Sequence, residues 1–81
     1  MNLPLIDAEA TGKNISRLRK ENNLSVHELA SILNFNTGNA IYKWQNGVSL
    51  PTLDNLVILA SIFHVSIDDI IIVRGGITNE E

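Results

Sequence analysis

Two polar side chains four residues apart, Asn39 and Lys43, have the types and spacing to make specific hydrogen bonds. Residues at i and i+4 lie on one face of a helix. A carboxamide can pair with adenine through two hydrogen bonds, and an ammonium group can donate to the acceptors of guanine. Tyr42 lies beside them, and Thr37 and Gly38 precede them, where free backbone amides can approach a phosphate or a base. The alternative is an ordinary solvated helix face.

The helix that must carry these groups is expected over about 38–46, with Gly47 as its end. Few of its residues suit a buried face, so most of its surface is left to solvent. The residues that suit burial are Ala40, Ile41 and Trp44. We therefore expect Trp44 in the core rather than stacked on a base.

A second short helix is expected just before it, over about 26–33. Ser25 can cap its N-terminus, and Glu28 completes a capping box three residues later. One buried stripe at helical spacing is formed by Leu29, Ile32 and Leu33. Asn34 tolerates the left-handed conformation that ends a helix, and Thr37 can cap the helix that follows. Two short helices joined by a tight turn make a helix-turn-helix pattern.

The chain resembles the Cro/CI-type (XRE) family of small bacterial and phage DNA-binding proteins. The matching segments, which run from about Gly12 to Ile72, are GKNISRLRKENNLS, HELA and AIYKWQNGVSLPTLDNLVILASIFHVSIDDII. The resemblance implies an all-α, compact five-helix domain of the lambda-repressor-like type, with the second and third helices as the helix-turn-helix. The turn is one residue longer than the family's commonest form, and Asn34 stands near a usual Gly.

Two further departures concern DNA contacts. Val26 stands where the family often has a Gln that touches DNA. Gln45 stands where a Glu usually pairs with the Arg held here by Arg19, so that pairing becomes a hydrogen bond to a neutral partner.

The resemblance assigns the readout of bases to Gly38, Asn39 and Lys43, with Tyr42 beside them. The candidates for phosphate contacts are Lys13, Arg17, Arg19, His27, Thr37 and Asn46. Two alternatives stay open: Arg19 could instead bond Gln45 across two helices, and Asn46 with Gly47 could serve only as a helix stop.

Three further helices should frame this pair. We expect the first over about 12–22, the fourth after a cap at Thr52 and the fifth after a cap at Ser66. The fourth should lie centrally, because its apolar arc is broad; that arc is Leu53, Leu56, Val57, Leu59, Ala60 and Phe63. The four β-branched residues in a row at 70–73 also suit a strand, but the cap and the acidic first turn favour a short helix.

The expected organisation has three parts. Residues 1–10 form an N-terminal arm, where Pro4 blocks a helix, residues 11–74 form the DNA-binding domain, and residues 75–81 form a flexible tail. The arm either folds back on the core, joins a dimer contact or remains untethered.

The charge of this 81-residue chain is unevenly distributed. A net charge of −3 alone argues against a nucleic-acid partner. Residues 11–47, however, hold five cations and two anions, a balance of +3, whereas the rest holds one cation and seven anions, a balance of −6. Because surface fields decay over about 10 Å at ordinary ionic strength, we expect a weak basic face with low, steeply salt-dependent non-specific affinity for DNA.

Other classes of protein find little support. The chain has no cysteine, its two histidines (His27 and His64) are far apart in sequence, and no nucleophile–base pair is visible. We therefore expect no enzyme, no metal and no cofactor. No apolar run approaches the roughly 20 residues that span a bilayer, and no secretory signal is visible. The expected location is the cytoplasm, on a prokaryotic nucleoid, with no membrane partner.

The leading interpretation is a sequence-specific regulator of transcription, a repressor, that binds double-stranded DNA with its third helix in the major groove and its second across the backbone. A homodimer is expected, because one module makes few base contacts. The dimer contact is assigned to Ile67–Val73, with the Leu3–Ile6 arm as a further contributor; the alternative is that Ile67–Val73 simply packs on the core. No small-molecule effector is evident. The alternative is a protein-interaction module of the same fold, an antitoxin or an adaptor of a larger regulator, which the acidic total and Val26 favour.

Overall fold

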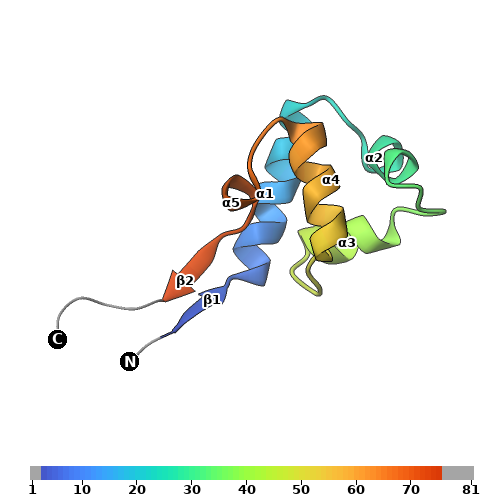
Figure 1. Cartoon of the computed structure of the whole chain (residues 1–81). Coiled ribbons are helices and arrows are strands. Elements are labelled where there is room, and N and C mark those ends of the chain that lie inside the picture. The colour runs from blue at the N-terminus through green and yellow to red at the C-terminus, as the bar shows by residue number, and fades with distance from the viewer. Residues whose placement is uncertain (1–2, 76–81) are drawn as a thin grey trace, which may run out of the picture.

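The computed structural model of the chain describes residues 3–75 and consists of five helices and two short strands (Figure 1). In chain order the elements are β1 (Pro4–Ile6), α1 (Ala8–Glu21), α2 (Val26–Ile32), α3 (Asn39–Gln45), α4 (Leu53–Phe63), α5 (Ile67–Ile70) and β2 (Val73–Gly75). The five expected helices are confirmed. The fold class is confirmed as mainly helical, and the two strands, which were not expected, pair into a small two-stranded sheet.

Helix α1 begins at Ala8, four residues before the predicted start. The Asp7 side chain accepts a hydrogen bond from the backbone N–H of Ala10 at 2.9 Å and so caps the helix. The prediction of a start at position 12 was wrong because this cap was overlooked. The end of the helix agrees with expectation: Asn22 is the C-cap, and Asn23 is left-handed with φ 58°.

The capping chemistry of α2 is confirmed. Ser25 Oγ accepts from the Glu28 N–H, and a Glu28 carboxylate oxygen accepts from the Ser25 N–H, both at 2.9 Å. Asn34 is left-handed, with φ 62°. The N-cap of α3 is Gly38 rather than Thr37, but the Thr37 hydroxyl still accepts a hydrogen bond from the Asn39 N–H at 3.3 Å.

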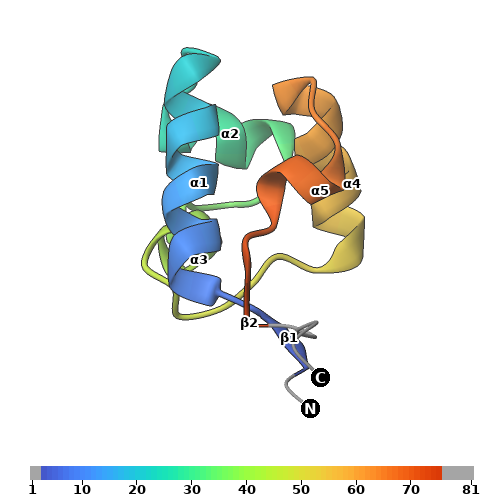
Figure 2. The same cartoon turned by 90° about the vertical axis from the view of Figure 1, so that its left-hand side faces the viewer.

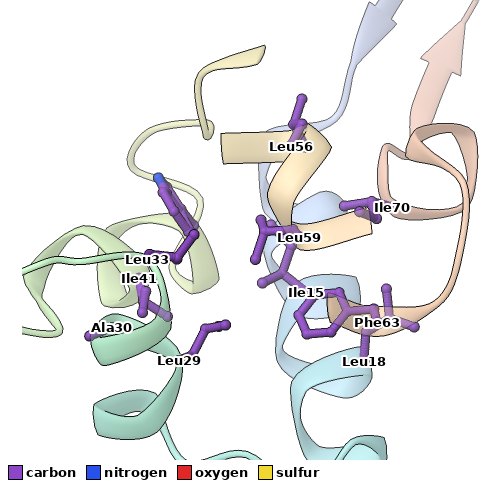
Figure 3. Packing of buried hydrophobic residues seen from close by; sticks show 11 residues of the cluster. Ile15, Leu18, Leu29, Ala30, Leu33, Ile41, Leu56, Leu59, Phe63 and Ile70 are labelled. Atoms are coloured by element: carbon purple, nitrogen blue, oxygen red, sulfur yellow. The ribbon is translucent and has the colours of Figure 1, made fainter. Parts of the chain in front are cut away.

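The core lies where α1, α2, α3, α4 and α5 meet, and Figure 3 shows its side chains converging from these elements. Trp44 is buried, as predicted, and its ring packs against that of Phe35 in a T-shaped arrangement, with 5.9 Å between the ring centroids. The prediction that Ile32 is buried was wrong, since 52% of it is exposed. Leu29 and Leu33 lie in the middle of the buried face of α2. Successive residues of a helix are about 100° apart, so Ile32 is turned away from Leu33 and toward solvent.

Helix α4 covers one side of the domain and is not central, which corrects the expectation drawn from its broad apolar arc. Figure 2 shows α5 between α1 and α4, and among residues 3–75 no helix or strand covers the outer face of α4, where Leu53 and Val57 are exposed. Leu56, Leu59 and Phe63 are buried, whereas Leu53 is 75% exposed. The helices of this small domain supply only one surface for α4 to pack on, so the rest of its arc remains in solvent; the exposed residues there are Leu53, Val57 and Ile58.

The C-terminal β-branched run divides between a helix and a strand. Helix α5 ends at Ile70, and Ile71 is already extended with ψ 128°. Strand β2 then pairs with β1 in antiparallel register, Leu5 opposite Arg74, and this two-stranded ribbon (3–6 and 73–75) extends away from the helices (Figure 1). The prediction of a short helix after Ser66 is confirmed for Ile67–Ile70, whereas Val73 forms a strand because β1 offers a partner that local sequence does not reveal. Of the predicted flexible tail, residues 76–81 lie outside the described residues.

Candidate nucleic-acid interface

Helix α3 presents a polar face on the side opposite its buried residues. Ile41 and Trp44 point into the core, and Ile41 is fully buried. The side chains on the outward face are those of Asn39, Tyr42, Lys43 and Asn46, all of them exposed. Three of the four predicted base-reading positions therefore share one solvent-facing surface, which is called the α3 face below.

The fourth predicted base-reading position, Gly38, serves the packing of the two helices. A Cβ at this position would lie 2.6 Å from Cγ1 of Val26 and 3.3 Å from Cε2 of Tyr42. Because such a contact is shorter than side chains tolerate, only glycine lets the start of α3 approach the start of α2 this closely. Sequence reasoning missed this role, although an apolar residue in place of the family's usual Gln at position 26 was a signal for it.

Arg19 connects α1 to α3. Its Nε donates to Oε1 of Gln45 at 2.9 Å, and its Nη1 donates to the carbonyl oxygen of Leu24 at 2.7 Å. The alternative structural role that the sequence left open for Arg19 is thus present in the fold. A charged donor with a neutral amide acceptor gives a stronger hydrogen bond than two neutral groups, so this link orients the C-terminal half of α3.

Two glycines bring α1 and α3 into backbone contact. A Cβ on Gly12 would overlap the carbonyl oxygen of Trp44 and lie 2.9 Å from that of Gln45. Gly47, with φ 73°, faces the first turn of α1, where a Cβ would lie 2.9 Å from Cα of Glu9. Gly12 was expected only at a helix start, whereas it lies within α1, where a glycine indicates close approach of another backbone.

The predicted phosphate-contacting cations do not gather in one place. Lys13 is exposed on α1. Arg17 forms an ion pair with Glu21 at 2.8 Å and donates to Oδ1 of Asn14 at 2.6 Å. Asn14 in turn donates to the carbonyl oxygens of Asp69 and Ile70, on α5. Arg17 therefore lies on the α5 side of α1, whereas Arg19 lies on the α3 side.

The other candidates for phosphate contacts flank the α3 face. His27 is exposed in the first turn of α2, and Thr37 is exposed just before α3. A shallow hollow opens between the helix-helix turn, α3 and the loop before α4. Its lining residues are Asn34, Phe35, Asn36, Thr37, Asn39, Ala40, Lys43 and Ser49. Amide, hydroxyl and ammonium groups thus surround the start of α3.

The titration of Glu28 follows from the capping box. The backbone N–H of Ser25, and then its hydroxyl, hydrogen-bond the carboxylate and lower the pKa of Glu28 below its ordinary value of 4.5; nearby His27 acts in the same direction. The carboxylate is therefore ionised at neutral pH and stabilises the N-terminus of α2.

Within residues 3–75, no three side chains of His, Cys, Asp or Glu come close enough together to hold a metal ion. No helix in this described part of the chain is both long and apolar enough to cross a membrane. Asp69, one of two adjacent carboxylates, is bonded to its own helix cap at Ser66.

Comparison with known proteins supplies the family. A helix-turn-helix family model matches residues 15–70. The solved structure of a transcriptional regulator from Listeria innocua is 32% identical, with a TM-score of 0.68 over 88% of this chain. This chain spans 62% of that regulator's length.

The DNA-binding domain of BldD has the same fold, with a TM-score of 0.68, 18% identity, and coverage of 82% of this chain and 94% of that domain. Among curated proteins, none matches the sequence. Because the family model matches residues 15–70, more than half of the sequence, the chain belongs to the Cro/CI-type (XRE) helix-turn-helix family.

Proposed function

We propose that this protein is a sequence-specific transcriptional regulator, acting as a repressor, that inserts α3 into the major groove of double-stranded DNA. The observation that carries the proposal is the α3 face, where Asn39, Tyr42 and Lys43 are exposed while Ile41 and Trp44 are buried. The major groove is about 12 Å wide and admits one α-helix. In this pose α2 lies across the sugar-phosphate backbone.

Base readout rests on Asn39 and Lys43, with Tyr42 at the edge of the same face. Asn39 suits adenine and Lys43 suits guanine, and each well-placed contact contributes about 1–3 kcal/mol of discrimination. Gly38 contributes no side chain and allows close approach. The phosphate-contacting set remains as inferred from sequence, with Lys13, His27, Thr37 and Asn46 exposed.

Binding is proposed to require two copies. Ile70 belongs to the core, so the Ile67–Val73 segment cannot supply the dimer contact as a whole. The exposed apolar residues of the ribbon are better candidates; they are Leu3, Leu5, Ile6 and Val73. A two-fold dimer would place its half-sites about 10–10.5 bp apart or at a multiple of this spacing.

Sedimentation analysis tests the dimer. The Leu5→Thr variant, which keeps β propensity but removes apolar surface, should be monomeric at concentrations where the natural chain is dimeric. Val57→Thr, an equally exposed change on α4, is the control and should leave the dimer intact. A dimer that is unaffected by Leu5→Thr would place the contact elsewhere.

Repression would follow from occupancy of a promoter, because a bound dimer excludes polymerase from the same DNA. The place of action would be the bacterial cytoplasm, on the nucleoid. In-vitro transcription from a promoter that overlaps the selected site checks this step, and more transcript in the presence of the protein would identify an activator.

A protein-interaction module of the same fold is the second candidate. The exposed apolar face of α4, where Leu53 is 75% exposed, favours it, because solvated helices seldom keep such residues without a partner. Fluorescence anisotropy with random duplexes at low salt separates the two candidates. No binding under these conditions would favour the interaction module.

In-vitro selection of bound duplexes from a random pool is the decisive experiment. We expect enrichment of a two-fold symmetric sequence, with half-sites at the spacing given above. A pool that stays random after repeated rounds would contradict sequence-specific recognition.

A further inference from the structure

An apolar contact lies at the border between α2 and the α3 face. The ring of Tyr42 and the side chain of Val26 both lie within contact distance of the position that a Cβ on Gly38 would occupy. Val26 is half-buried, because it also packs on the core, and Tyr42 is 52% exposed. Together, Val26 and Tyr42 form a small apolar surface, called the Val26–Tyr42 patch below.

The patch borders the polar groups proposed to read bases. Tyr42 lies between Asn39 and Lys43 in sequence order on the same exposed face of α3. A base edge in the major groove is almost entirely polar, with hydrogen-bond donors and acceptors. Its one apolar group is the C5-methyl of thymine. An apolar patch on a groove-facing surface therefore has a single complementary partner among the four bases.

We propose that the Val26–Tyr42 patch contacts the C5-methyl of a thymine and makes these two residues determinants of specificity. The inference rests on the proposed entry of α3 into the major groove. Gly38 is part of this arrangement, because a Cβ there would lie 2.6 Å from Cγ1 of Val26 and 3.3 Å from Cε2 of Tyr42, and the two side chains would have to move. Where the family often has a Gln that touches DNA, Val26 would instead contact a methyl group of the DNA.

Uracil substitution tests the proposal on the selected duplex. Uracil differs from thymine only by the C5-methyl, so each thymine of the site is replaced singly and the dissociation constant is measured by fluorescence anisotropy. At one thymine in each half-site we expect affinity to fall about fourfold, the equivalent of about 0.8 kcal/mol for one buried methyl group. At the remaining thymines, affinity should stay unchanged.

Variants assign the effect to the patch through the ratio of affinities for thymine and uracil duplexes. Val26→Ala and Tyr42→Ser should bring this ratio close to one. Tyr42→Phe keeps the ring and should keep the ratio. Ile32→Ala, at an exposed apolar residue of α2 away from the patch, is the matched control and should also keep it. Lys43→Ala should weaken binding to both duplexes while preserving the ratio.

Circular dichroism shows whether each variant is folded. If Val26→Ala is not folded, Val26→Thr takes its place.

The outcomes separate the inference from the function it rests on. A selected sequence without a thymine in either half-site, or one in which no uracil substitution lowers affinity, overturns the inference and leaves the regulator function standing. A methyl effect that survives both Val26→Ala and Tyr42→Ser also overturns it. Failure to select any sequence overturns both.

Discussion

Gly12 of α1 and the backbone carbonyl of Trp44 on α3 are in direct contact, so closely that a Cβ at position 12 would overlap the carbonyl oxygen. The adjacent residue of α1, Thr11, holds the chain just before strand β2. Thr11 is buried, and its Oγ1 accepts the Ile72 N–H at 2.9 Å. The first turns of α1 therefore connect the ribbon to the C-terminal end of α3. A change at position 12 acts on the orientation of the proposed recognition helix.

Gly12→Ala should destabilise the fold, although alanine is usually the better helix former. The obstacle is backbone, which cannot rotate away as a side chain would, so α1 and α3 must separate. We expect a loss of about 1–3 kcal/mol in the free energy of unfolding, measured by urea denaturation with Trp44 fluorescence. Lys13→Ala, at an exposed neighbour, is the control and should change stability by less than about 0.5 kcal/mol. Equal stability of Gly12→Ala and the natural chain would contradict the contact.

Lys43→Ala should weaken binding to the selected sequence by about 1–3 kcal/mol and relax the preference at one base pair, because it removes one base contact. The fold should be unaffected, since Lys43 is exposed. Anisotropy against the selected duplex and its single-base variants measures both effects. An equal loss of affinity on all duplexes would show that Lys43 contacts phosphate instead of a base.

Lys13→Ala should weaken binding to every sequence alike. A phosphate contact releases counterions, so its loss should lower the slope of log affinity against log salt by about one. Arg17→Ala should have a smaller effect on binding, because its guanidinium is already held by Glu21 and Asn14. The comparison uses random duplexes across a salt series. A larger effect from Arg17 than from Lys13 would show that the ion pair opens on DNA.

Glu28→Gln should make the free energy of unfolding less dependent on pH in the acid range. The pKa of Glu28 is lowered in the folded state, so the unfolded chain takes up the proton more readily. The stabilisation is complete above the ordinary pKa of 4.5 and is lost as the pH falls through the lower folded value. Glutamine can still complete a capping box. Urea midpoints from pH 7 downward should therefore fall less for Glu28→Gln than for the natural chain, and parallel curves would refute this.

The capping residues and the buried positions of α3 were predictable from sequence. Ser25 with Glu28, and Asn34, act through atoms within a few residues, so their identities and spacing are sufficient. The burial of Ile41 and Trp44 followed from helical periodicity, and the outward direction of Asn39 and Lys43 followed from it in turn.

The sequence suggested two roles for Arg19, a phosphate contact or a hydrogen bond to Gln45, but could not distinguish between them. Its partner Gln45 lies 26 residues away, and only the packing of α1 against α3 brings the two side chains together. The same holds for Gly38, whose neighbours Val26 and Tyr42 come from both sides of the turn.

By itself, the sequence determined the five helices, most of their caps and the polar side of α3, because these depend on local hydrogen bonding and on the helical repeat. Only the tertiary structure decided that β1 pairs with β2, that Ile32 and Leu53 face solvent, and that Gly12 admits a neighbouring backbone. Each of these depends on which surfaces meet in space, and an apolar side chain is buried only where another element is available to cover it.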